Sequence, residues 1–139
     1  MPHLEAGQFA SRFVALVLGG NGFPARPLDR HVLLVSATLG LEPGRRYAER
    51  ELNEELRRWT TRFGDAVGLD HVSLRRHLVD AGYVTRDSAG RSYLLAEENL
   101  PYTGDASIRA LDLNALVVEA RAERERRKRE HLGSTAPHP

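Results

Sequence analysis

The segment that decides the fold spans residues 70–95 and reads DHVSLRRHLVDAGYVTRDSAGRSYLL. Asp70 suits the N-cap of a short helix over His71–Ala81, because its carboxylate can accept a hydrogen bond from the first turn. Gly82 suits the end of that helix. The apolar side chains recur at helical spacing, at Val72, Leu74, Leu78 and Val79. The first half of the segment therefore predicts a short amphipathic helix.

A β-hairpin is predicted directly after this helix. The stretches Tyr83–Asp87 and Arg91–Leu95 alternate apolar and polar residues, as half-buried strands do. Between them, Ser88-Ala89-Gly90 has the small residues of a tight turn. The segment thus places a helix and a hairpin next to each other in the chain.

Further helices, a short strand and two connecting segments are expected on either side. In chain order they are a helix over Leu4–Leu18 ended by Gly19, Gly20 and Gly22, a helix over Pro27–Leu41, a short strand at Arg45–Tyr47, a helix over Ala48–Phe63, a loop over Gly64–Gly68, a linker over 98–106, and a last helix from Ser107 or Asp112 to about His131. We divide the chain into an N-terminal amphipathic helix (1–22), a central domain (23–97), the linker, a charged C-terminal helix (107–132) and a disordered tail (133–139). The expected fold class is mainly α with a small β-hairpin, an α+β fold.

The order of elements in the central domain is that of a winged helix, here flanked by N- and C-terminal helices. In that architecture the third core helix enters the major groove of DNA, and the hairpin lies against the backbone or the minor groove. The candidate DNA-binding residues are His71, Ser73, Arg75, Arg76 and His77 on the helix, and Arg86 and Arg91 on the hairpin. Arginine can bind guanine through two hydrogen bonds, and serine or histidine can bind a phosphate. The predicted function is therefore that of a DNA-binding, transcription-regulator-like winged-helix protein.

The same residues admit a structural interpretation. Arg75 and Arg76 are adjacent and point about 100° apart on a helix, so one of them can pair with an acid of the preceding helix. The acids in question are Glu49, Glu51 and Glu55. Arg30 can reach the same acids, and Asn53 can satisfy a backbone group. The alternative function is a protein–protein interaction module on a winged-helix fold that does not bind DNA.

The charge balance limits the DNA-binding interpretation. The chain has 20 Lys+Arg against 19 Asp+Glu, a formal net charge of +1, and Lys128 is its single lysine. Residues 23–97 hold 12 Arg and 11 Asp+Glu, so the central domain is itself +1. This balance excludes a protein that coats nucleic acid by bulk charge, and it predicts a smaller basic surface than a dedicated DNA-binding domain usually has.

Other classes of protein are disfavoured by what the sequence lacks. The chain contains no cysteine, which excludes disulfides and thiolate chemistry. The longest apolar run, Phe13–Leu18, is too short to span a membrane, so we expect a cytoplasmic protein without membrane association. The residues His71, His77 and Asp80 lack the spacing of a site with three or four metal ligands, and no nucleophile–base set is visible. We therefore expect no enzymatic activity, no metal and no cofactor.

The last predicted helix has two different halves. The apolar half, Ile108–Val118, can pack on Leu4–Leu18 within one chain or between two. The charged half, Glu119–Glu130, places Glu123 and Arg127 at the spacing of a helical ion pair. Flanking helices that pair across a two-fold axis would set two DNA-binding domains side by side. The expected partners are therefore double-stranded DNA and a second copy of the chain, paired through the terminal helices.

Three segments of the central domain carry a resemblance to a known family. They are Phe23–Arg30, Tyr47–Leu56 and Leu74–Gly82, followed by Arg86, Gly90 and Tyr93. Their Tyr-x-Glu-x-Glu-x-Asn and Leu-Arg-Arg-x-Leu-Val-Asp motifs resemble those of a bacterial domain of unknown function, found alone or fused to ArsR-type winged-helix transcriptional regulators. The resemblance implies a small winged-helix-like fold and an association with transcriptional regulators, but no ligand or reaction. Its motif residues are Arg30, Tyr47, Glu49, Glu51, Asn53, Asp80 and Tyr93.

The chain departs from the family pattern in three places. Leu39 stands where an aromatic residue is more usual, and Leu94 stands where tryptophan is frequent. The segment Thr60–Leu69 is longer than usual. We expect these differences to alter the packing of the hairpin and the loop at the end of the helix predicted over Ala48–Phe63.

Overall fold

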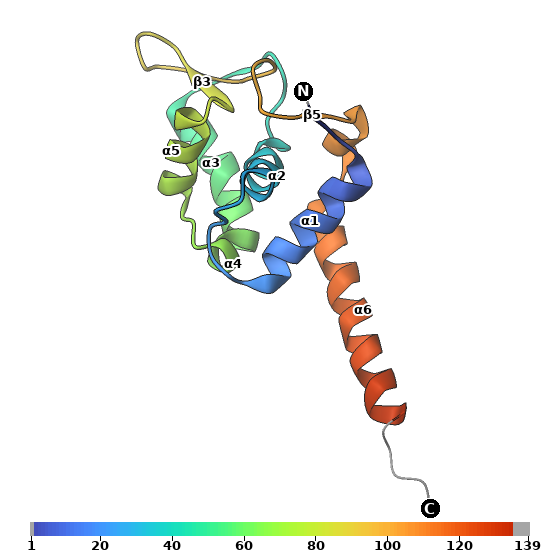
Figure 1. Cartoon of the computed structure of the whole chain (residues 1–139). Helices are drawn as coiled ribbons and strands as arrows, with labels where there is room; N and C mark the ends of the chain where they lie inside the picture. The colour runs from blue at the N-terminus through green and yellow to red at the C-terminus, as the bar shows by residue number, and fades with distance from the viewer. Residues whose placement is uncertain (1, 135–139) are drawn as a thin grey trace, which may run out of the picture.

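Figure 1 shows the fold of the protein in this computed structural model, which describes residues 2–134. In chain order the elements are β1 (His3–Leu4), α1 (Ala6–Gly19), α2 (Pro27–Thr38), β2 (Arg46–Tyr47), α3 (Glu49–Trp59), the π-helical segment η1 (Thr60–Gly64), α4 (Asp65–Val67), α5 (His71–Asp80), β3 (Val84–Arg86), β4 (Tyr93–Leu95), β5 (Thr103–Gly104), the 3-10 helix η2 (Ala106–Ala110) and α6 (Leu113–Ser134). The chain is mainly helical with a small antiparallel sheet, which confirms the expected α+β class.

The antiparallel sheet has the strand order β2-β4-β3. Leu94 at its centre pairs with Arg46 on one side and with Thr85 on the other. The predicted hairpin and the predicted short strand are therefore both present and belong to one sheet. The hairpin strands are shorter than expected, and the amide of Asp87 donates to the carbonyl of Ser92 at 3.0 Å beyond their ends.

The expected loop over residues 64–68 is wrong, because the chain stays helical from α3 through η1 to Val67. Phe63 and Val67 are buried, so the apolar pattern of the helix continues past the glycine that suggested a break. The helix ends at Gly68, whose φ of 66° is a left-handed conformation that glycine adopts without strain.

The helix α2 ends at Thr38, three residues before the predicted Leu41. Two of its hydroxyl groups donate to backbone carbonyls one turn back, Ser36 to Leu33 at 2.5 Å and Thr38 to Val35 at 2.7 Å. Such bonds compete with the regular helical ladder and favour a helix end.

The N-terminal region differs from its prediction in the first residues. The helix was expected from Leu4, but residues 3 and 4 form β1 and pair in parallel with β5. One carboxylate oxygen of Asp105 accepts a hydrogen bond from the amide of Ala6 at 3.0 Å, and the other lies 2.7 Å from Nε2 of His3. The expected linker over 98–106 therefore contains a strand and the first residue of η2. We call this contact between β1 and residues 103–105 the terminal clasp.

A single hydrophobic core includes residues from both flanks of the central domain. Phe9, Phe13 and Val17 of α1 are buried, as are Ile108 of η2 and Val117 of α6. The helix α1 packs beside α2 and beside the first part of α6, so the two terminal helices meet within one chain (Figure 1).

Of the two predicted starts of the last helix, Asp112 is right and residue 107 is wrong, because residues 106–110 form the separate 3-10 helix η2. The Asp112 carboxylate accepts a hydrogen bond from the amide of Ala115 at 3.0 Å, which is an N-cap contact. The expected ion pair between Glu123 and Arg127 is present at 3.1 Å. The helix runs to Ser134, beyond the expected end at His131, and its outer half projects from the body of the protein (Figure 1). The expected disordered tail begins at residue 133, and its residues 135–139 lie outside the described part.

No helix within residues 2–134 is long and apolar enough to cross a membrane.

Candidate nucleic-acid interface

The helix α5 forms where the sequence predicts, and its cap fixes its first turn. The carboxylate of Asp70 accepts a hydrogen bond from the amide of Ser73 at 2.7 Å, and this bond lowers the pKa of the Asp70 carboxyl. Leu74 and Leu78 are buried on the inner face, whereas Val72 and Arg76 are exposed on the outer face. His71 and Ser73 are half-buried at the start of the helix.

Arg75 is tied to α3 directly, and to β4 through Glu49. Its Nη1 atom donates to Oδ1 of Asn53 at 2.6 Å and lies 3.8 Å from Oε1 of Glu49. The hydroxyl of Tyr93 donates to the same Glu49 oxygen at 3.1 Å. Burial of the ring, and then this bond to a carboxylate, raise the pKa of Tyr93. The structural interpretation of Arg75 is therefore confirmed, because its contacts link α5 to α3 and, through Glu49, to β4.

His77 also makes a structural contact. Its ring stacks on Phe23, with ring centroids 4.3 Å apart and planes inclined by 19°. The guanidinium of Arg30 lies 4.8 Å from the centroid of the same Phe23 ring. These contacts hold the segment before α2 against α5, and they account for Arg30 without an acidic partner.

Three of the predicted cations are exposed, and one of them, Arg86, also places its guanidinium 5.8 Å from the centroid of the Tyr93 ring. Arg76 on α5, Arg86 on β3 and Arg91 at the hairpin are exposed. Arg76 and Arg86 border one hollow of about 200 Å³ between α5, α3 and the sheet. In the part of the chain that the structure describes, no acidic side chain lies within ion-pair distance of these three guanidinium groups. We call the surface formed by Val72, Arg76, Arg86 and Arg91 the α5–hairpin surface.

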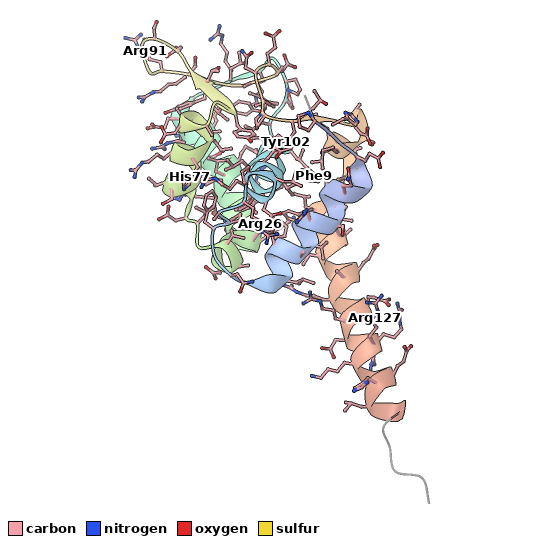
Figure 2. The ribbon with its side chains drawn as sticks, viewed as in Figure 1. Phe9, Arg26, His77, Arg91, Tyr102 and Arg127 are labelled. Atoms are coloured by element: carbon pink, nitrogen blue, oxygen red, sulfur yellow. The ribbon has the colours of Figure 1, made fainter. Side chains whose placement is uncertain are left out.

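The turn that carries Arg91 is internally braced. The carboxylate of Asp87 accepts hydrogen bonds from the Arg91 amide at 2.6 Å and from the Ser92 hydroxyl at 3.0 Å. The bond from the Arg91 amide lowers the pKa of Asp87. Gly90 has a φ of 70°, which suits glycine at this position. Figure 2 shows Arg91 at the outer end of the hairpin, far from α6.

Acidic groups limit the basic character of this surface. Asp80 is exposed, and it borders the same hollow as Arg76 and Arg86, together with Glu49.

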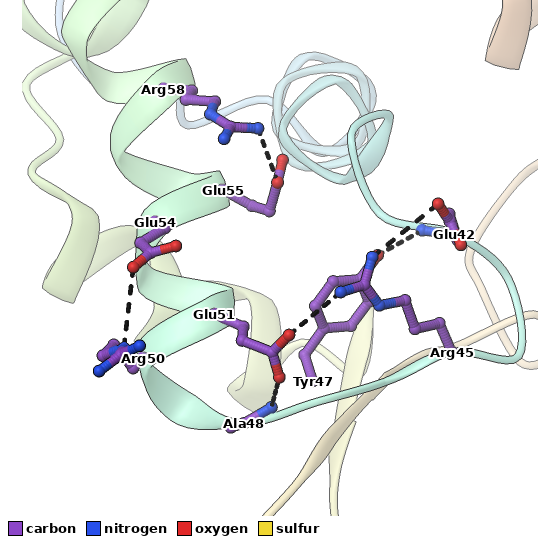
Figure 3. A network of polar contacts seen from close by, with 9 residues as sticks. All are labelled: Glu42, Arg45, Tyr47, Ala48, Arg50, Glu51, Glu54, Glu55 and Arg58. Atoms are coloured by element: carbon purple, nitrogen blue, oxygen red, sulfur yellow. Dashed lines mark hydrogen bonds and ion pairs between the residues drawn. The ribbon is translucent and has the colours of Figure 1, made fainter.

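The remaining motif residues stabilise the start of α3 (Figure 3). The Tyr47 hydroxyl accepts a hydrogen bond from the Glu42 amide at 2.8 Å. The Glu51 carboxylate accepts one from the Ala48 amide at 3.0 Å and one from Arg45 at 3.1 Å. Within residues 2–134, no cluster of three or more histidine or carboxylate side chains could hold a metal ion.

A second polar site was not predicted from the sequence. Nδ1 of His31, on α2, lies 2.7 Å from the hydroxyl of Tyr83, and the ring centroid of Tyr102 is 4.8 Å from that of His31. His31 is 4% exposed. Burial lowers the pKa of His31 to about 4, and burial raises the pKa of Tyr83 to about 12. A histidine among the apolar residues of a helix is the one sequence signal that could have indicated this pair.

We expect the stability of the protein to fall with acidity through His31. The folded pKa of about 4 lies below the ordinary 6.5, so between these values the unfolded chain binds more protons and unfolding is favoured as the pH falls. One edge of the ring borders a cavity, so we expect a loss of about 2 kcal/mol rather than the ~3 kcal/mol of the whole pKa difference.

The measurement is the free energy of unfolding in urea between pH 7 and pH 4, for the wild type and for His31→Phe. The carboxyl groups titrate in both proteins and cancel in the difference. Parallel curves for the two proteins would contradict the prediction.

Comparison with known proteins identifies the family. No curated protein and no solved structure matches the chain. Residues 21–95 match a family described as an uncharacterized protein conserved in bacteria (DUF2087). The matched region runs from before α2 to the end of β4, so it contains both the α5–hairpin surface and the His31–Tyr83 pair. The chain therefore belongs to this family of bacterial conserved domains.

Proposed function

We propose that the protein binds double-stranded DNA through the α5–hairpin surface, as a winged-helix protein associated with transcriptional regulation. In this proposal α5 enters the major groove and the β3–β4 hairpin lies along the backbone or the minor groove. Arg76 reads a base edge or a phosphate, and Arg86 and Arg91 contact the backbone. Arg75 and His77 position α5 rather than contact DNA.

The observation that carries the proposal is the placement of Arg76 and Arg86 on two sides of one exposed hollow, with Arg91 beyond them. A helix and a hairpin that present exposed arginines side by side can reach a groove and its flanking phosphates together. The strand order β2-β4-β3 beside α5 also supports a winged-helix arrangement.

The test is a titration of a fluorescent random-sequence duplex at two salt concentrations, with the full chain. We expect the wild type to bind at about 50 mM salt and to lose affinity steeply by about 200 mM. Replacing Arg76, Arg86 and Arg91 with glutamine removes three cations, and we expect the slope of log K against log salt to fall by roughly 3.

A matched control removes the same charge elsewhere. Arg50, Arg57 and Arg62 are exposed on α3 and η1, and their replacement with glutamine changes the net charge equally. The proposal fails if the wild type does not bind at low salt, or if this control weakens binding as much as the first variant.

We also propose that the protein dimerises through its terminal helices. Most of the apolar face of α1 is covered within the chain, so the supporting feature is the projecting part of α6, where Val118 is 55% exposed. Deleting residues 118–139 removes Val118 and keeps the buried Ile108 and Val117, and light scattering should show a dimer for the full chain and a monomer for the truncated one. A monomer in both would end this proposal.

The α5–hairpin surface also suits a protein partner. Val72 is 41% exposed, and the hollow that it borders is lined by both acids and arginines. Mixed charge around an apolar centre is common at protein interfaces. If the duplex titration shows no binding at low salt, we propose that this surface binds a protein instead.

A further inference from the structure

A cavity of about 280 Å³ lies between α2, the terminal clasp and the base of the hairpin. Much of its lining is apolar and includes side chains from both flanks of the family domain, among them Phe9, Val35, Leu95, Leu100 and Ile108. Figure 2 shows Phe9 between α2 and α1, and Tyr102 close to α2. Apolar cavities with few polar groups are typical binding sites for small molecules.

Two buried polar side chains line the cavity, His31 and Thr38, and the hydroxyl of Thr38 already donates to the carbonyl of Val35. The His31 ring is neutral near pH 7, because burial lowers its pKa to about 4. A neutral imidazole has one acceptor nitrogen, and Nδ1 lies 2.7 Å from the Tyr83 hydroxyl, a distance that fits either tautomer. We assign Nδ1 as the acceptor, because the Tyr83 hydroxyl has no other acceptor for its hydrogen among the described residues. In this tautomer the hydrogen of the ring is on Nε2.

Nε2 is available to a ligand. Nε2 has no hydrogen-bond partner among the described residues. Every fully buried side-chain nitrogen or oxygen of these residues does have a partner. Nε2 is thus not enclosed by protein atoms, and the space that His31 borders is the cavity. The cavity wall therefore presents one N–H donor in apolar surroundings, where a hydrogen bond is strengthened by low polarity.

The charges at the rim disfavour an anion. Glu97 and Asp105 border the cavity, and the pKa of Asp105 is lowered, mainly by its hydrogen bond with His3. Arg109 is the one rim cation among the described lining residues, and its guanidinium donates to the carbonyl of Leu41. Two carboxylates and one engaged guanidinium leave a negative rim.

We propose that this cavity binds a neutral, largely apolar molecule of the size of two fused rings that carries one hydrogen-bond acceptor oxygen, held by Nε2–H of His31. A dry cavity of about 150 Å³ binds benzene, so the larger volume here suits a bicyclic body. The acceptor is a ketone, ester, lactone or amide carbonyl, whose oxygen pairs with the N–H group. This inference does not depend on DNA binding.

The test uses two probes of nearly equal shape and the full-length wild type. 2-Acetylnaphthalene has the acceptor carbonyl, and 2-ethylnaphthalene lacks it. Both are titrated against isotope-labelled protein, and chemical-shift changes are followed at the His31 ring and at backbone amides. We expect saturable changes around Phe9, His31 and Leu95, and roughly threefold to tenfold tighter binding of the ketone, the range of one hydrogen bond.

Each outcome of the titrations supports or overturns binding at the cavity beside His31. Saturable shifts at the cavity with the ketone preferred support the proposal. Equal affinity for both probes overturns the acceptor requirement and with it the role of His31. Shifts confined to other surfaces, or no saturable shift, overturn the site.

Two variants localise the effect. In His31→Phe the preference for the ketone should vanish while the ring of 2-ethylnaphthalene still binds. Ala96 borders the cavity, so Ala96→Leu should weaken both probes at least tenfold, whereas Ala89→Leu at the exposed hairpin turn should change neither. The wild-type pair of probes decides the proposal even if a variant does not fold.

Discussion

Replacing Phe13 with alanine is expected to lower the free energy of unfolding by about 3–5 kcal/mol. The side chain is fully buried on α1, and its ring meets that of Phe63 edge to face, with centroids 5.1 Å apart. The variant loses the transfer free energy of the ring, the aromatic contact and the packing of atoms around the resulting cavity.

The measurement is urea unfolding followed by circular dichroism, with Val72→Ala on α5 as the control. Val72 is 41% exposed and lies outside the proposed dimer contact, so its truncation should change stability by less than about 0.5 kcal/mol. This prediction also tests whether α1 belongs to the same cooperative unit as the family domain. If α1 were an independent appendage, Phe13→Ala would leave the main transition unmoved.

Gly64→Ala is expected to destabilise the protein by about 3 kcal/mol, the upper end of the usual overpacking cost. A Cβ atom at this position would lie 2.5 Å from the carbonyl oxygen of Leu69 and 3.0 Å from Cβ of Thr60. The Leu69 oxygen belongs to the backbone, so it cannot move without disturbing the chain between α4 and α5.

Gly7→Ala provides a matched comparison on another helix. A Cβ atom at Gly7 meets nothing within 4 Å, so the same substitution should stabilise the protein by roughly 0.5–1 kcal/mol through helix propensity. Thermal unfolding of the two variants should therefore shift in opposite directions. A neutral or stabilising Gly64→Ala would show that η1 can relax around the added methyl group.

Much of the central fold could be predicted because its signals are local. Three of these signals depend on residues close together in the chain: the Asp70 cap, Gly82 after the helix, and the apolar–polar alternation of the hairpin strands. All three features appear in the structure. The loop predicted at Gly64 failed because buried neighbours, Phe63 and Val67, outweighed the low helix propensity of glycine. The strand pair of the terminal clasp was missed because it joins residues about a hundred positions apart.

The candidate site was predictable in its residue types and less so in their roles. Helical spacing placed Arg75 and Arg76 on α5, but only the packing of α3 against α5 shows that Asn53 and Glu49 engage Arg75 and leave Arg76 exposed. The His31–Tyr83 pair joins residues 52 positions apart, so the local pattern can point to a buried histidine in α2 but cannot name its partner. The contacts between polar side chains that are far apart in the chain are therefore the part of the site that the sequence does not predict.

The terminal clasp has a consequence for biosynthesis. The first strand of the chain to be made pairs with one of the last, β1 with β5, so it has no partner until residue 104 has left the ribosome. The family domain can assemble its sheet before that moment, because β2, β3 and β4 end at Leu95. The cavity beside His31 is then completed only when Asp105 reaches the amide of Ala6. The closing of the pocket therefore joins a wall that is made before the family domain to one that is made after it.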